Sequence, residues 1–186
     1  VVLGIDGFLF VSGNFAFEKG ETLTVTEAGS TTTHQATALK IGASDVVAFA
    51  GVGAPTLTDD DHDGSLDGPL GSGPVGVLLE NFMFGMAVIT SNDGTRKWTA
   101  LKGRGSAKLV GIDGFELSGC MTAEVNTAAA TGVPIDFTRL TTGRLRVVTG
   151  ADADDFVDLD FSGETLKVAG NVVLQLDEFV FLSGGF

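Results

Sequence analysis

The sequence has no Tyr, one Trp, one Cys, four Pro and two His among its 186 residues. Cys120 cannot form a disulfide within the chain, and its small and apolar neighbours from Leu117 to Met121 predict a buried thiol. Two His and one Cys are too few for a transition-metal centre. No Gly-x-Ser-x-Gly element that positions a hydrolase nucleophile occurs. Asp is abundant enough to leave the paired carboxylates of a glycoside hydrolase open. Because the recurring motifs of the chain serve strand packing, we nevertheless expect that the protein is not an enzyme.

Basic residues are also scarce, with 11 Lys and Arg against 24 Asp and Glu and a formal net charge of −13. This balance repels a phosphate backbone, so nucleic acid is not an expected partner. No apolar run approaches the ~20 residues needed for a membrane-spanning helix, so membrane insertion is not expected. No basic stretch followed by an apolar one opens the chain as in a secretion signal, and we expect the sequence to begin within a longer protein.

The residue types that are abundant in the chain favour β-structure. The chain has 27 Gly and 14 Phe, and 44% of its residues are hydrophobic. Polar and apolar residues alternate in Thr22–Thr26 and Val157–Phe161, as in half-buried strands. Phe8–Phe17 is apolar except at Ser12–Asn14, which predicts a strand covered on both faces. The best helical candidate is Ala123–Thr131, but its Thr and Gly favour a loop or one short turn. The predicted class is all-β.

The sequence also repeats itself. Residues 172–186 (VVLQLDEFVFLSGGF) match residues 1–15 (VVLGIDGFLFVSGNF) at nine positions. This predicts one complete tandem unit, residues 1–171, followed by the start of the next, residues 172–186. Shorter echoes occur inside the unit, such as Val110–Phe115. Because a neighbouring unit would cover exposed strand edges, we expect an elongated β-solenoid or stacked β-sandwich, with strands shared between adjacent repeats.

Three strings carry a resemblance to a known class of protein: Leu9–Gly20, Leu109–Gly114 and Leu166–Val172. They resemble the tandem repeats of very large bacterial adhesin-like exoproteins, some of which carry an LEPR-XLL region. The resemblance spans most of the chain, including the Thr-Ala-Leu-Lys segment at 99–102. It implies secretion and a role at the cell surface or in a biofilm matrix, and it carries no defined activity or ligand.

The sharpest chemical motif is the acidic segment 59–67, DDDHDGSLD. In a calcium loop of this form, the ligands would be Asp59, Asp61, Asp63, Ser65 through its carbonyl, and Asp67. Position 12 of such a loop is Leu70, so an EF-hand is not expected and other parts of the chain would complete the shell. The alternative is a solvated acidic turn. We expect structural Ca²⁺, because a divalent cation relieves the repulsion among crowded carboxylates.

A second acidic stretch covers Asp152–Asp160. Its strand part, with Asp158 and Asp160 opposite the apolar residues, has an ordinary amphipathic pattern. The preceding residues Asp152–Asp155 form an expected loop that either is solvated or binds a second ion.

Two functional hypotheses follow. The first is a structural extracellular repeat protein that forms a filament, sheath or long adhesive stalk stiffened by Ca²⁺. Its partners would be adjacent copies of the repeat and cell-surface or matrix polysaccharide. The second is a ligand-binding β-domain for carbohydrate or, with less support, ice. Trp98 is the candidate aromatic platform for a sugar, and Thr22, Thr24, Thr26 and Thr31–Thr33 are the candidate ice-binding residues.

Overall fold

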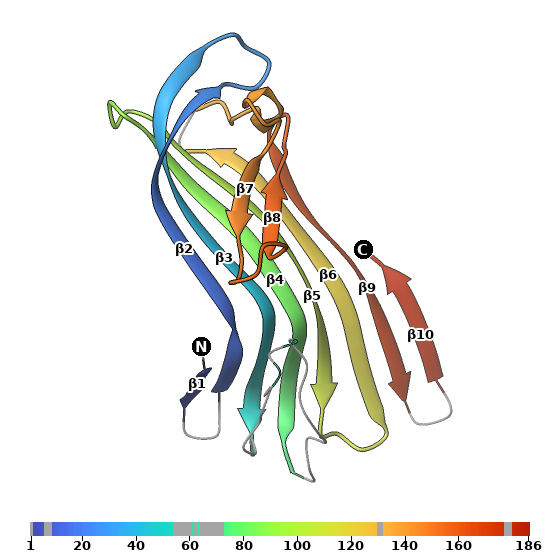
Figure 1. The fold of residues 1–186 in the computed structure, drawn as a ribbon. Coiled ribbons are helices and arrows are strands. Elements are labelled where there is room, and N and C mark those ends of the chain that lie inside the picture. The colour runs from blue at the N-terminus through green and yellow to red at the C-terminus, as the bar shows by residue number, and fades with distance from the viewer. Residues whose placement is uncertain are drawn as a thin grey trace.

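A computed structural model of the chain describes residues 2–5, 9–53, 61, 63, 73–129, 132–176 and 180–186. Eight strands form one antiparallel sheet in the order β1-β2-β3-β4-β5-β6-β9-β10 (Figure 1). They are β1 (Val2–Ile5), β2 (Leu9–Thr26), β3 (Thr33–Val52), β4 (Val75–Ser91), β5 (Lys97–Val110), β6 (Phe115–Ala128), β9 (Thr165–Leu176) and β10 (Val180–Gly185). A second sheet pairs β7 (Leu145–Val148) with β8 (Phe156–Leu159), and a 3-10 helix, η1, covers Phe137–Arg139.

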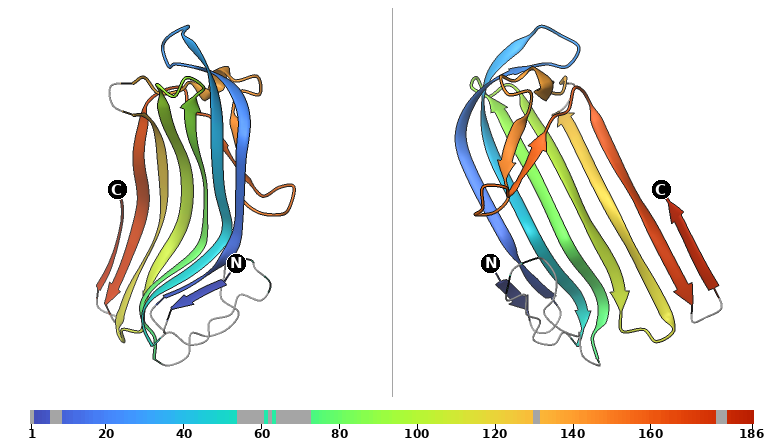
Figure 2. Two further views of the ribbon diagram at one scale, coloured as in Figure 1. Left: turned by 90° about the vertical axis from the view of Figure 1, so that its left-hand side faces the viewer. Right: turned by 45° about the vertical axis from the view of Figure 1, so that its right-hand side comes forward.

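The large sheet is a meander in which nearly every strand pairs with the next strand of the chain. The segment between β6 and β9 holds η1, β7 and β8, and these elements lie on one side of the sheet (Figures 1 and 2). We call this side the inner face and the opposite side the outer face. The all-β prediction is confirmed. The solenoid prediction is wrong for the described residues, because their antiparallel strands lie side by side in an open sheet instead of winding into successive coils.

The main hydrophobic core lies between the β7–β8 hairpin and the inner face. The sheet contributes mostly small side chains, among them Ala36, Ala38, Ala87 and Ala100, all at most 1% exposed. Bulky residues from the hairpin side fill the space above them, namely Ile135, Phe137, Leu145, Val147, Leu159 and Phe161. Because small residues face large ones, the hairpin can approach the sheet closely.

Two glycines make this approach possible. A Cβ built on Gly42 of β3 would lie 2.0 Å from the backbone oxygen of Val148. On Gly85 of β4 it would lie 2.7 Å from Cβ of Val157. Gly42 and Gly85 are paired across β3 and β4, so the sheet has no side chain at either position beneath the β7–β8 hairpin.

A line of register shifts crosses the sheet below the hairpin. The shifts fall at Ser12/Asn14 in β2, Ala43/Val46 in β3 and Glu80/Met83 in β4. Asp45 and Asn81 lie within them, each with φ of 51°. Asp and Asn tolerate this left-handed conformation better than other non-glycine residues. β-Bulges increase the twist of a sheet and bend it. Below this line of bulges, a second hydrophobic cluster packs Val47, Phe49 and Leu78 against Phe10 and Val110.

The turn between β4 and β5 is closed by Asp93. Its carboxylate accepts hydrogen bonds from Ser91 Oγ at 2.5 Å and from the backbone N–H of Thr95 at 3.0 Å. These hydrogen bonds lower the pKa of Asp93 to about 2. Asp93 therefore keeps its charge, and the turn its geometry, well below neutral pH.

The strand prediction for Thr22–Thr26 is confirmed, since this segment lies in β2. The prediction for Val157–Phe161 is confirmed for Val157–Leu159, because β8 ends at Leu159. The loop prediction for Ala123–Thr131 is wrong over most of its length, because residues up to Ala128 belong to β6. This segment pairs with β5 on one side and β9 on the other, and that pairing outweighs the weak local preferences of Ala and Thr.

The prediction that Phe8–Phe17 is covered on both faces is wrong for the part that the structure describes. Phe17 is 70% exposed and Phe15 is 36% exposed. On the inner face of this strand Ser12 is buried, at 1% exposed, whereas the phenylalanines on its outer face are exposed. Both faces of this strand are therefore rich in small or apolar residues, but no described residue covers one of them.

Candidate functional site

The two outer edges of the sheet are each half open. β1 pairs with β2 over Leu9–Ser12, so no described strand lies beside β2 from Phe15 to Val25 on that side. At the other edge, β10 pairs with β9 over Asn171–Leu176, and Phe186 exchanges backbone hydrogen bonds with Gly170. No described strand lies beside Thr165–Ala169 on that side. Both open half-edges lie at the end of the sheet where the β7–β8 hairpin packs (Figure 1).

The paired halves of the two edges have the same register. At the first edge, Val2 pairs with Ser12 and Ile5 with Leu9. At the other edge, Val173 pairs with Ser183 and Leu176 with Val180. Each residue of the second set follows its counterpart by the same 171 positions that separate the two copies of the sequence motif. The β9–β10 hairpin is therefore the β1–β2 hairpin again, six strands farther along the sheet.

The open half-edges hold unusually exposed apolar side chains. Leu166 is 80% exposed and Val168 is 53% exposed on β9, and Phe17 is 70% exposed on β2. An unpaired strand edge with apolar side chains is a template for pairing with another strand.

Charged residues of opposite sign lie beside these apolar ones. Lys167 of β9 lies 3.7 Å from Glu124. On β2, Glu18 and Glu21 contact Lys40 at 2.9 and 2.8 Å. Partial burial acts against the charge of Lys40, but hydrogen bonds and charge from Glu21 and Glu18 outweigh it, and the pKa of Lys40 is raised. On the inner face, the open half-edge of β9 thus carries a cation and that of β2 carries anions.

The outer face of the sheet is the second notable surface. Side-chain alternation, followed through the strand register, places a continuous band of apolar residues on this face across all strands from β2 to β10. The larger members are Phe15, Phe17, Leu39, Ile41, Phe82, Phe84, Met86, Leu101, Met121, Val125, Leu166, Val168, Leu174, Leu176 and Leu182. We call this band the apolar band. Lys19 on β2 and a row of threonines, among them Thr22, Thr37 and Thr90, border it toward the hairpin end.

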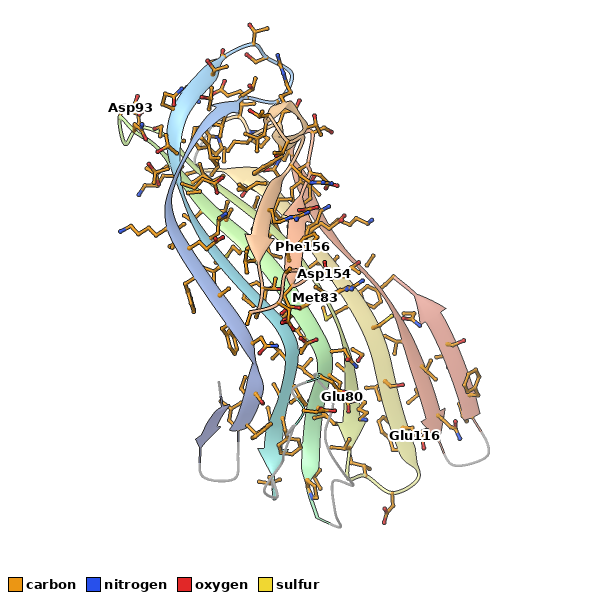
Figure 3. All side chains as sticks on the ribbon, viewed as in Figure 1. Glu80, Met83, Asp93, Glu116, Asp154 and Phe156 are labelled. Carbon is orange, nitrogen blue, oxygen red and sulfur yellow. The ribbon has the colours of Figure 1, made fainter. Side chains whose placement is uncertain are left out.

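The inner face below the hairpin has the opposite character. Lys108 pairs with Glu80 at 2.7 Å, and Arg104 Nε contacts Met83 Sδ at 2.9 Å. Figure 3 shows Met83 beneath the hairpin, near Phe156 and Asp154, and Glu80 farther down the sheet. A depression of about 420 Å³ lies here, lined by Asp45, Asn81, Arg104, Ser106, Cys120 and Thr122 among others. The described charged groups of the sheet are therefore concentrated on the inner face.

The predicted calcium loop falls largely outside the described residues. Asp59, Ser65 and Asp67 are not described, and Asp61 and Asp63 are both exposed. The backbone N–H of Asp63 donates to Asp61 Oδ1 at 3.3 Å. Within the described part of the chain, no three His, Cys, Asp or Glu residues come together as a metal site. The calcium site therefore stays a prediction.

The second acidic stretch follows its amphipathic pattern. Leu159 and Phe161 enter the core, and Asp158 on the opposite face pairs with Arg144 and Arg146, each at 3.2 Å. Asp160 pairs with Lys102. In the preceding loop, the backbone N–H of Asp152 donates to Asp155 Oδ2 at 3.1 Å. The structure thus assigns the strand aspartates to ion pairs, and the second ion at Asp152–Asp155 stays an open prediction.

Other candidate residues from the sequence are placed differently from expectation. Trp98 is 1% exposed and donates through Nε1 to Val133 O at 2.8 Å, so it offers no platform to a sugar. Cys120 is exposed, and its Sγ lies 2.6 Å from Asn171 Oδ1, so the prediction of a buried thiol is wrong. Its small neighbours line an uncovered part of the sheet instead of a core.

The candidate ice-binding threonines do not form one exposed row. Thr22 and Thr24 are exposed on β2, but Thr26 is 7% exposed. Thr31 and Thr32 lie before β3, and Thr33, its first residue, pairs with the buried Thr26.

No protein-family model, curated protein or solved structure matches this chain. Among the described residues, no helix has the length and apolar character needed to cross a membrane. The arrangement of edges and faces is therefore the evidence from which a function is inferred.

Proposed function

We propose that this chain is a structural repeat unit whose sheet continues without a break into the next copy. The observation that carries the proposal is the identical register of the β1–β2 and β9–β10 hairpins. If the two hairpins are one element, the lower part of β9 is also the β1 of the next copy. Each copy then adds six strands to a single antiparallel sheet.

If the β9–β10 register continues into the next copy, it pairs the open half-edge of β9 with the open half-edge of β2 in that copy. Gly185 pairs with Asn171, and Phe186 exchanges hydrogen bonds with Gly170. In the next copy, the residues corresponding to Gly185 and Phe186 are Asn14 and Phe15. Continuing along both strands brings Val168 opposite Phe17 of the next copy.

The next pair along the junction is Lys167 opposite Glu18 of the next copy. Both residues lie on the inner face, as Glu18 and Lys40 do within the unit. Opposite charges on directly paired residues stabilise a sheet by roughly 0.2–1 kcal/mol. At these two positions the junction joins apolar to apolar and cation to anion, which supports pairing in this register, and the next pair sets Lys19 opposite Leu166.

In this proposal the protein is an extracellular filament, sheath or stalk. A continuous sheet leaves few strand edges exposed, which suits a structural or surface-covering role. Ca²⁺ at Asp59–Asp67 would stiffen each unit, and cell-surface or matrix polysaccharide would be the adhesive target. This setting rests on the sequence resemblance and on the acidic composition.

A disulfide trap tests the junction. In a chain in which residues 1–171 are followed by residues 1–186, Val168→Cys is placed in the first copy and Phe17→Cys in the second, with Cys120→Ser in both. Directly opposed strand residues have Cβ atoms about 4.5–5.5 Å apart, close enough for a disulfide after small adjustment. We expect rapid, nearly complete cross-linking on mild oxidation, mapped by proteolysis and mass spectrometry.

The matched control moves one cysteine by two residues on the same strand face. Phe15→Cys in place of Phe17→Cys sets a diagonal separation of about 7–8 Å and should cross-link far more slowly. Equal rates for the two pairs, or no cross-link in either, would contradict a continuous sheet in this register.

A further inference from the structure

The apolar band on the outer face has no described element packed against it. β7, β8 and η1 all lie on the inner face (Figure 2). Met121 on β6 is 42% exposed and Val168 on β9 is 53% exposed. Monomeric soluble proteins rarely leave a contiguous apolar surface of more than a few hundred Å² open to water.

The lack of charged side chains in the apolar band limits the kinds of partner that can bind it. On the outer face, side chains between the threonine row and the lower end of the sheet are apolar on β2–β6, β9 and β10, with Lys19 at the border. An anionic lipid headgroup or an acidic peptide would need cations, and the described cations of the sheet lie chiefly on the inner face or at this border. The fitting partner is therefore another uncharged apolar surface.

The relief of the band favours a second sheet. Gly103 and Gly105 of β5 lie beside Phe84 and Phe82 of β4, since a Cβ on either glycine would come within 3.2 and 2.7 Å of these phenylalanines. This leaves a trough along β5 next to an aromatic ridge. A depression of about 240 Å³ lies in this trough, with Leu101 and Met121 also in its lining. An aromatic ridge of this kind on an opposed, identical sheet would have room to enter the trough.

The area is sufficient for a stable interface. The six long strands, β2–β6 and β9, lie about 4.8 Å apart, and about ten residues of each at about 3.3 Å per residue cover roughly 1,000 Å². A specific protein interface buries about 800 Å² per partner. One face of one chain thus meets the requirement by itself.

We propose that the outer face is an interface between two copies of this chain, packed face to face as the two layers of a β-sandwich. Two identical sheets have the same strand spacing and twist, so their side chains can interdigitate over the whole face, about 10 Å apart. One supporting argument rests on the proposed array: open sheets beyond about ten strands curl, split or flatten by stacking, and a second layer allows the array to extend.

The test uses the single chain and variants that alter a sheet face but leave both edges unchanged, so an edge-to-edge dimer would not respond to them. Sedimentation velocity over a range of concentrations should show a dimer. Met121→Glu places a charge in the centre of the interface and should raise the dimer dissociation constant at least about 100-fold. Thr122→Glu is the matched control. Thr122 is the adjacent residue, exposed on the inner face opposite Arg104, and its variant should dimerise like the unmodified chain.

Circular dichroism on both variants establishes that the sheet is intact. A monomer at all concentrations, or a dimer that Met121→Glu leaves unchanged, would overturn the proposal. A monomer that binds neutral phosphatidylcholine vesicles would overturn it too, in favour of a lipid surface. Because the disulfide trap tests the edges separately, failure here leaves the junction proposal standing.

Discussion

Replacing Trp98 with alanine is expected to lower the free energy of unfolding by about 3–5 kcal/mol. Trp98 is the largest fully buried side chain among the described residues and lies 5.6 Å, ring centre to ring centre, from His34. Its removal leaves a cavity between the sheet and residues such as Ile135, and the carbonyl of Val133 loses its donor. Urea unfolding followed by circular dichroism at 25 °C measures the loss.

Trp98→Phe separates the two contributions. It keeps an aromatic ring in the core but removes the hydrogen bond to Val133, and it should cost clearly less than alanine. A loss below about 1 kcal/mol for Trp98→Ala would mean that the hairpin and the sheet are not held together around this residue.

Replacing Gly42 with alanine is expected to cost about 2–3 kcal/mol, although alanine favours strands no less than glycine does. The new methyl group would lie 2.0 Å from Val148 O and 2.9 Å from Cα of Thr149, so backbone must move. The β7–β8 hairpin would then lift from the sheet and expose Val147. The fluorescence of Trp98, which is the only Trp in the chain, reports this core directly.

Gly163→Ala is the matched control, since a Cβ there meets its nearest neighbour, Ala28 Cβ, at 3.9 Å. It should change stability by less than about 0.5 kcal/mol. Equal effects at the two glycines would show that the hairpin does not lie against Gly42.

Part of this fold could be predicted from the sequence because the signals are local. Alternation predicted strands at Thr22–Thr26 and at Val157–Phe161, of which Val157–Leu159 lies in β8. The repeat of residues 1–15 at 172–186 identified the element that recurs at both sheet edges. The internal echo Val110–Phe115 also has a structural meaning. It spans the connection between β5 and β6, as Leu3–Phe8 precedes β2, so the motif marks a strand-to-strand connection.

Other features could not be predicted because they depend on which sheet face is covered. The surroundings of Cys120 and Phe17 are apolar in sequence, and sequence alone does not tell an apolar face packed inside the chain from one left for a partner. The sequence predicts a loop at Ala123–Ala128 because the local preferences of its Ala and Thr are weak, and its pairing with β5 and β9 cannot be read from the segment itself. Trp98 looked like a surface residue between Lys97 and Thr99, but side chains alternate between the two faces of β5, and that of Trp98 points into the core.

The central claim, a sheet that continues from copy to copy, is tested most directly by the axial length that each copy adds. Small-angle X-ray scattering or cryo-electron microscopy on chains of one, two and three copies measures this increment. Six strands per copy at about 4.8 Å predict an increase of about 29 Å for each copy, with strands perpendicular to the growth axis. Increments near the full length of the strands, or copies that tumble as separate particles, would contradict the continuous sheet.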